Sequence, residues 1–117
     1  MERTCALRLT RRYVASPQVV WAALTDPDSL ARWLGPMADA VPGSVRAREV
    51  ERLLELEWTP PGETPSLVRL ELRADGDGTV LVLDHSRIDA RAGMRALGLW
   101  ERHLERLGAV VERAEAR

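Results

Sequence analysis

The sequence contains no lysine, asparagine or phenylalanine, and Cys5 is its single cysteine. One cysteine cannot form a disulfide within the chain, which is typical of a reducing compartment. No apolar run approaches the ~20 residues that a membrane-spanning helix needs. The N-terminal stretch, MERTCALRLTRR, has no signal-peptide core. We therefore expect a cytoplasmic protein that does not associate with membranes.

An excess of charge of one sign is also missing. The 17 basic residues are all arginines, and 18 acidic residues bring the net charge to −1. Because the acidic residues are interspersed among the arginines, no basic stripe forms that would bind nucleic acid. Metal binding would have to bring Cys5, a histidine and a carboxylate together without a closely spaced ligand motif, so neither metal nor cofactor is expected. The length of 117 residues and the 45% hydrophobic content predict a single globular domain over 1–117.

Residues 14–36, VASPQVVWAALTDPDSLARWLGP, hold the most specific pattern of the chain. Ser16-Pro17 and Asp26-Pro27 each place a capping side chain before a proline, so two short helices are predicted. Helices this short are unstable alone and need a larger apolar surface to lie on. The residues expected to face that surface are Val20, Ala23 and Leu24 in the first helix and Leu30, Trp33 and Leu34 in the second.

Alternation of apolar and polar residues predicts strands on both sides of these helices. Residues 4–14 alternate as a half-buried strand, and residues 67–73 and 79–86 flank a DGDG hairpin signal. Residues 45–59 fit a helix by their Glu and Leu content, but the hairpin context favours strands, most clearly at 53–59. The stretch 37–44 is predicted to be a loop.

From Asp89 onward the apolar period changes to three and four, which predicts a long amphipathic helix. The order of strand, two short helices, antiparallel strands and long helix predicts an α+β fold. In it, a curved antiparallel sheet of about five strands surrounds the C-terminal helix. The apolar stripe of that helix consists of Leu97, Trp100, Leu104, Leu107 and Val111.

These motifs resemble a known superfamily. The pattern ASPxxVWxALTDPxxLxxWxGP follows a strand ending in Arg11 and Tyr13, TxLxLxH ends at His85, and WxxxLxxL starts at Trp100. The combination is similar to the helix-grip superfamily of START, polyketide-cyclase and birch-pollen-allergen proteins. Within it, the chain most resembles the branch named for the activator of the heat-shock chaperone ATPase.

The resemblance implies a cavity between the sheet and the long helix, and it also exposes a difference in length. Members of the branch continue from WxGP into a further β-hairpin that this chain lacks, so the sheet is expected to be smaller, and either the cavity or a sheet edge is expected to be less covered. An uncovered edge can pair with a second copy, and a homodimer is expected on that ground.

The residues expected to line the cavity are those on the inner faces of the strands and helices. Apolar walls with few polar groups are typical of small-molecule sites, although the same side chains could close into an ordinary packed core. The candidate ligand-binding residues are Arg11, Tyr13, Trp33, Trp58, Leu70, Leu83, His85, Leu97, Trp100 and Leu104.

The polar candidates allow more than one interpretation. Arg11 either enters the cavity and needs a carboxylate partner or lies solvated at a strand end with its apolar stem buried. His85 and His103 either meet across the pocket as an acid–base pair or are hydrogen-bonded residues at the core edge. The run Asp84-His85-Ser86 cannot act as a triad, because successive strand residues face opposite sides.

Three functions remain open from the sequence. The first is binding of a small hydrophobic or aromatic molecule in the cavity. The second is a cyclase- or hydrolase-like enzyme in which Arg11, Tyr13 or His85 polarises a carbonyl. The third is a protein-interaction domain with a filled core, as in the chaperone activator. No catalytic residue can be assigned.

Overall fold

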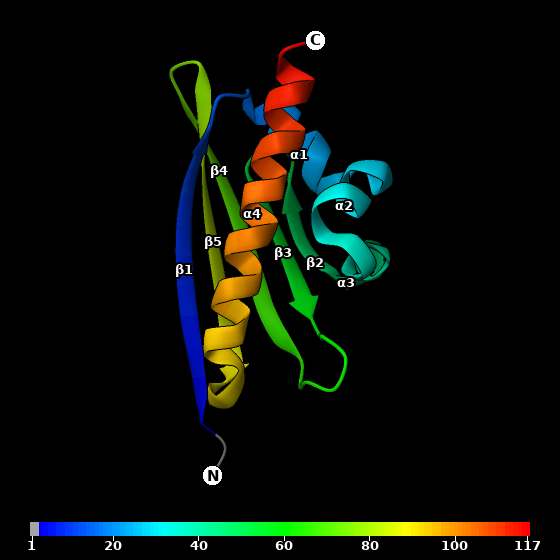
Figure 1. The fold of residues 1–117 in the computed structure, drawn as a ribbon, viewed down its shortest axis with the longest axis vertical. Coiled ribbons are helices and arrows are strands. Elements are labelled where there is room, and N and C mark those ends of the chain that lie inside the picture. The colour runs from blue at the N-terminus through cyan, green and yellow to red at the C-terminus, as the bar shows by residue number, and fades with distance from the viewer. Residues whose placement is uncertain (1–2) are drawn as a thin grey trace.

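The computed structural model describes residues 3–117 as a five-stranded antiparallel sheet with a long helix lying along one face (Figure 1). The first two residues of the predicted domain lie outside the described residues. The helix is α4 (Gly93–Glu115), preceded by the short 3-10 helix η2 (Ala90–Ala92). The strand order is β1-β5-β4-β3-β2. The strands are β1 (Thr4–Tyr13), β2 (Val45–Glu49), β3 (Leu53–Trp58), β4 (Ser66–Asp75) and β5 (Gly78–Asp89).

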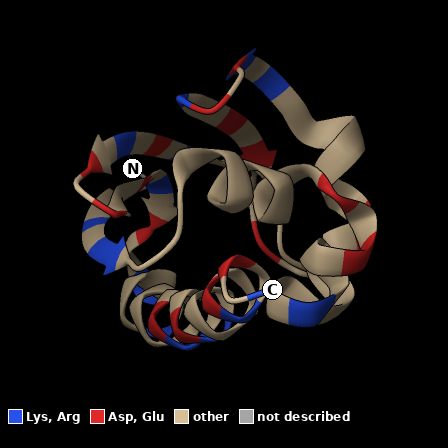
Figure 2. Cartoon of the chain, turned by 90° about the horizontal axis from the view of Figure 1, so that it is seen from above, with Lys and Arg blue, Asp and Glu red and all other residues tan. Residues whose placement is uncertain are grey.

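This arrangement confirms the predicted α+β helix-grip fold with about five strands. Seen from above, the strands curve beside α4, and Figure 2 shows acidic and basic segments mixed along strands and helices alike. Within residues 3–117, no helix is both long enough and apolar enough to span a membrane.

The two predicted short helices are present as α1 (Pro17–Thr25) and α2 (Pro27–Leu34). Ser16 Oγ accepts a hydrogen bond from the Val19 N–H at 3.3 Å, and Asp26 Oδ2 accepts one from the Ser29 N–H at 3.0 Å. These bonds satisfy amide groups that the first turn of a helix leaves unpaired. The predicted inner faces are buried, namely Val20, Ala23 and Leu24 in α1 and Leu30, Trp33 and Leu34 in α2.

The prediction of a loop at 37–44 is wrong. This stretch forms the 3-10 helix η1 (Gly35–Ala40) and the single-turn helix α3 (Val41–Ser44). Pro36 and Pro42 each occupy a first-turn position, where the fixed φ of proline suits a helix and its missing N–H costs nothing. The ambiguous segment 45–59 resolves into β2 and β3, which confirms the strand prediction at 53–59 to within one residue.

The β4–β5 hairpin turns at the DGDG signal, as predicted. Asp75 pairs with Gly78, and Gly76 adopts a φ of 60°, which glycine reaches without strain. Arg12 of β1 donates to Asp75 Oδ2 at 2.8 Å and to Asp77 Oδ1 at 2.9 Å. The hydrogen bond and positive charge of Arg12 lower the pKa of Asp77. The turn is therefore fastened to the strand that lies on the other side of β5.

One hydrophobic core fills the space between the sheet, α4 and the short helices. The predicted stripe of α4 is buried except for Leu97, which is half-buried. Gly108 lies in the same face, and a Cβ there would come within 3.0 Å of the Tyr13 ring. The sheet contributes Leu54, Leu56, Trp58, Val68, Leu70, Leu72, Leu81 and Leu83.

Of the two alternatives, a less covered cavity or a less covered sheet edge, the structure shows β2 as an edge strand of the sheet. Arg46, Arg48 and Glu49 are exposed on this strand, and its pairing with β3 shifts register between Val45 and Ala47. Charged side chains and bulges are features that protect an edge against pairing with another chain. The homodimer through this edge stays a prediction, and the observed edge chemistry does not favour it.

The tight fit at Gly78 gives a test of the packing. An added Cβ would lie 2.5 Å from the Tyr13 carbonyl oxygen, whereas a Cβ at Gly43 would meet nothing within 4 Å. Gly78→Ala should lower the free energy of unfolding by about 1–3 kcal/mol, because the added methyl group would overlap the backbone of Tyr13 and the guanidinium of Arg12. Gly43→Ala should be neutral or slightly stabilising. The free energies of unfolding of both variants are measured by urea denaturation, and equal values would contradict the close packing at Gly78.

Candidate functional site

The space between the sheet and α4 is largely filled by its own side chains. Trp58 of β3 and Trp100 of α4 are buried, with ring centroids 5.1 Å apart and ring planes tilted by 41°. A cavity of about 60 Å³ remains at the N-terminal end of α4. We call it the Trp cavity; its lining residues are Met37, Trp58, Pro60, Glu63, His85, Arg95, Ala96, Leu99, Trp100 and His103.

Five parts of the fold, β3 with Trp58 among them, bring these residues together. Met37 comes from η1, Pro60 and Glu63 from the loop between β3 and β4, and His85 from β5; the rest, apart from Trp58, are on α4. Glu63 and Arg95 form an ion pair at 3.7 Å. This pair links the β3–β4 loop to the first turn of α4 at the rim of the Trp cavity.

A chain of hydrogen bonds runs behind the cavity. Trp100 Nε1 donates to His85 Nδ1 at 2.9 Å, and His85 Nε2 lies 2.7 Å from Ser66 Oγ. Ser66 Oγ in turn donates to the Trp58 carbonyl oxygen at 2.8 Å. Because an indole N–H can only donate, His85 Nδ1 is unprotonated and Nε2–H donates to Ser66. All three side chains thereby use their polar atoms within the protein.

The state of His85 follows from this arrangement. Burial lowers its pKa to about 4, since the charged imidazolium would lose its hydration. The neutral ring donates to Ser66 and cannot accept the proton of its hydroxyl, which general-base activation of a serine would require. The Ser66–His85 contact is therefore a structural link and not a nucleophilic pair.

His103 faces the same cavity and is held differently. Its Nδ1 lies 3.1 Å from the Trp33 carbonyl oxygen, so Nδ1 carries a proton and donates. Burial lowers the His103 pKa, and the charges of Arg106 and Arg102 lower it further, against the opposing effect of the Trp33 hydrogen bond. The neutral ring leaves Nε2 as a hydrogen-bond acceptor.

The two histidines share a cavity but do not form the acid–base pair that was one interpretation of the sequence. Each packs edge-on against Trp100, with ring centroids 6.0 Å away for His85 and 5.6 Å for His103. Among residues 3–117 no hydrogen bond joins them. Asp84, next to His85, lies on the outer sheet face and pairs with Arg8 at 2.6 Å. The two residues therefore face opposite sides, as predicted, and cannot belong to one catalytic triad.

The structure places the ten candidate residues at different depths. Trp58, His85 and Trp100 line the Trp cavity. Leu97 is half-buried and does not line the Trp cavity. Four others lie in the packed core, namely Trp33, Leu70, Leu83 and Leu104.

Tyr13 and Arg11 lie away from the Trp cavity. The Tyr13 hydroxyl donates to the Leu104 carbonyl oxygen at 2.7 Å, and burial raises its pKa. Arg11 is half-exposed and donates to the Thr10 carbonyl oxygen at 3.0 Å, which matches the strand-end interpretation. Tyr13 pairs with Thr79, six residues along β5 from His85 and so about 20 Å away. These side chains cannot act on one carbonyl.

Sequence reasoning missed several residues of the site. Ser66 precedes the alternating stretch from which β4 was predicted, and nothing in the pattern marks it as a partner of His85. The others come from loops or from helix positions outside the apolar stripe, where periodicity carries no signal. They are Met37, Pro60, Glu63, Arg95, Ala96 and Leu99.

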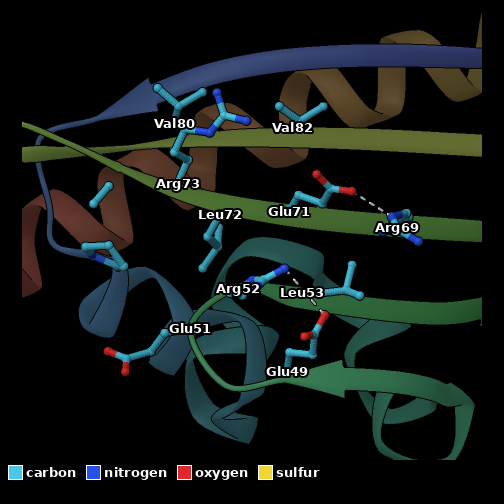
Figure 3. Close-up of a pocket in the computed structure, with 12 residues that line it drawn as sticks. Glu49, Glu51, Arg52, Leu53, Arg69, Glu71, Leu72, Arg73, Val80 and Val82 are labelled. Carbon is cyan, nitrogen blue, oxygen red and sulfur yellow. Dashed lines mark hydrogen bonds and ion pairs between the residues drawn. The ribbon is translucent and has the colours of Figure 1, made fainter.

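A larger hollow, of about 560 Å³, lies where β4 and β5 extend past the β2–β3 hairpin. Figure 3 shows Glu71 directed toward Arg69 and Arg52 toward Glu49; these pairs are 2.8 and 3.9 Å apart. The charges compensate one another, and the hollow lies mainly on the outer sheet face. Its charged residues are Glu49, Glu51, Glu71, Arg52, Arg69 and Arg73. Among the residues described, no three His, Cys, Asp or Glu side chains are grouped to hold a metal ion.

The fold and the position of the cavity define a helix-grip domain of the polyketide-cyclase-like kind, as the sequence motifs suggested. Residues 14–112 match the family model described as Activator of Hsp90 ATPase homolog 1-like protein. The match covers most of the chain, and the chain belongs to this family.

Solved structures with the same fold agree with this assignment. CalU16 from Micromonospora echinospora is 27% identical, with a TM-score of 0.77 over 91% of this chain and 65% of the CalU16 chain. The AHSA1-like protein RHE_CH02687 from Rhizobium etli is 27% identical, with a TM-score of 0.77 over 96% of this chain and 87% of that one. MLL2253 from Mesorhizobium loti is 22% identical, with a TM-score of 0.82 over 93% of this chain and 98% of the MLL2253 chain.

The chain thus spans slightly less than two thirds of the CalU16 chain and nearly all of MLL2253. No curated protein matches it in sequence. The family model establishes the family and the solved structures show the fold, whereas the ligand has to be argued from the site.

The buried His85 makes a prediction for pH dependence. Its pKa of about 4 in the folded chain lies below the value of 6.5 expected on unfolding. As the pH falls from about 6.5 to about 4, only the unfolded chain takes up this proton, so the free energy of unfolding should decrease. Imidazole NMR should show the Nε2–H tautomer and no titration of His85 until near pH 4.

The variant His85→Gln serves as the control, because it removes the titrating group and keeps hydrogen-bonding atoms. Its stability, measured by urea denaturation, should depend less steeply on pH over this interval than that of the unaltered chain. A His85 ring that titrates near pH 6.5 would contradict the buried, neutral network.

Proposed function

We propose that the chain binds a small aromatic molecule in the Trp cavity. The observation that carries the proposal is a mostly apolar hollow that contains two tryptophans and lies at the end of the sheet–helix interface. Aromatic side chains with a few polar groups are the usual lining of small-molecule sites. Membership in a family with the helix-grip fold supports the same interpretation.

The cavity has to widen to hold such a ligand. Its volume of about 60 Å³ would hold roughly two water molecules, whereas a cavity that binds benzene measures about 150 Å³. The movable parts are at the rim. Met37 has a flexible side chain that adapts to its neighbours, and the β3–β4 loop is joined to α4 at this point by the Glu63–Arg95 pair. A surface ion pair is worth about 0–1 kcal/mol, so the Glu63–Arg95 pair itself opposes opening only weakly.

A second function, a protein-interaction domain with a filled core, is favoured by a different observation. Buried side chains fill most of the interior, and α4 exposes two large apolar side chains near the Trp cavity, Met94 at 81% and Leu99 at 39%. In that case the cavity would not widen for any small molecule. Ligand binding therefore separates the two functions.

The test compares two identical substitutions on α4. Ala96→Phe places a ring in the Trp cavity, whereas Ala109→Phe places one at an exposed position outside it. Toluene should shift the NMR signals of the Trp58 and Trp100 indole groups and raise the unfolding temperature. At ten times the dissociation constant, the expected stabilisation is about 1.4 kcal/mol.

Ala96→Phe should abolish both effects, and Ala109→Phe should retain them. Folding of each variant is checked by its far-UV circular dichroism. If toluene leaves the unaltered chain unchanged, or if Ala96→Phe responds as strongly as Ala109→Phe, the ligand-binding function is wrong. The filled-core interaction domain would then be the better interpretation.

A further inference from the structure

Among the described residues, most polar side-chain groups around the Trp cavity already have a partner within the protein, and one ring nitrogen does not. Both ring nitrogens of His85 are used, and so is the indole N–H of Trp100. Glu63 and Arg95 compensate each other's charge. His103 uses only Nδ1, and among residues 3–117 its Nε2 has no hydrogen-bond partner. His103 Nε2 is thus an uncharged acceptor without a partner in the described part of the chain, on a residue that lines the Trp cavity.

The orientation of this acceptor is fixed by the backbone of α2. The hydrogen bond from Nδ1–H to the Trp33 carbonyl sets the tautomer, and Trp33 itself does not line the Trp cavity. Nε2 is the ring nitrogen that remains free to accept a hydrogen bond from an occupant. The edge-on contact with Trp100 holds the ring plane. The acceptor is therefore preorganised before any ligand arrives.

We infer that the ligand of the Trp cavity is a phenol-type molecule, whose hydroxyl group donates a hydrogen bond to His103 Nε2 while its ring packs against Trp58 and Trp100. This inference rests on the proposed function, because it requires that the cavity accepts an aromatic ring. It adds the polar group that the ligand carries and the residue that recognises it.

The electrostatics of the wall favour a neutral hydroxyl over a charged group. Glu63 and Arg95 already pair with each other, so the wall that the described residues form offers no unpaired charge to a carboxylate or an ammonium group. A carboxylate also could not accept a hydrogen bond from an unprotonated Nε2. The neighbouring charges of Arg102 and Arg106 keep the His103 ring neutral, in addition to burial. A neutral donor needs no charged partner and loses less hydration on entering an apolar site.

The experiment compares p-cresol with p-xylene, which have nearly the same shape and differ by one hydroxyl group. Dissociation constants are measured by NMR titration of the indole N–H signals of Trp58 and Trp100. One hydrogen bond to an uncharged acceptor should make p-cresol bind about tenfold more tightly. His103→Phe keeps a ring at this position and removes the acceptor, so the ratio of the two constants should fall to about one.

The matched control is Glu105→Gln, an exposed change two residues further along α4, which should leave the ratio at its original value. Equal binding of p-cresol and p-xylene by the unaltered chain would overturn the inference and leave the proposed function intact. A preference that survives in His103→Phe would overturn the role of His103. Binding of neither compound would overturn the proposed function itself, and the inference with it.

Discussion

The contact of Trp100 with the sheet is the interaction on which the arrangement depends. Its indole N–H bonds to His85 of β5, and its ring packs against Trp58 of β3 and His103 of its own helix. One side chain thus joins α4 to two strands by a hydrogen bond and by apolar contact. Because the polar atoms involved are buried, removing one partner would leave the other without hydration. The position of α4, and with it the shape of the Trp cavity, follows from this contact.

Much of the fold could be predicted from local signals. Ser16-Pro17 and Asp26-Pro27 mark helix starts through short-range chemistry, and alternation or a three-four period reports which face of an element is buried. The loop prediction for 37–44 is wrong because Pro42 and Gly43 suit a turn as well as a short helix. The strands at 45–59 needed the hairpin context, since Glu and Leu favour a helix when considered alone.

The site could be predicted only in part. Inward-facing positions such as Trp58, His85 and Trp100 follow from periodicity, and the structure places them at one cavity. Periodicity does not report how far a side chain fills the space in front of it, so the sequence left open whether the interior holds a cavity or closes into a packed core. Nor does it report which hydrogen-bond partner, such as Ser66, a buried histidine acquires from another strand.

The short connection from α2 to β2 has a consequence for how the domain can change in length. Pro42 and Gly43 are exposed there, and the strand that follows has a free outer side. Extra residues inserted between them would leave the packed interior untouched, and a grafted hairpin could continue the sheet beyond β2. The domain is therefore a short version of its architecture, and an insertion between Pro42 and Gly43 is a way to enlarge its sheet.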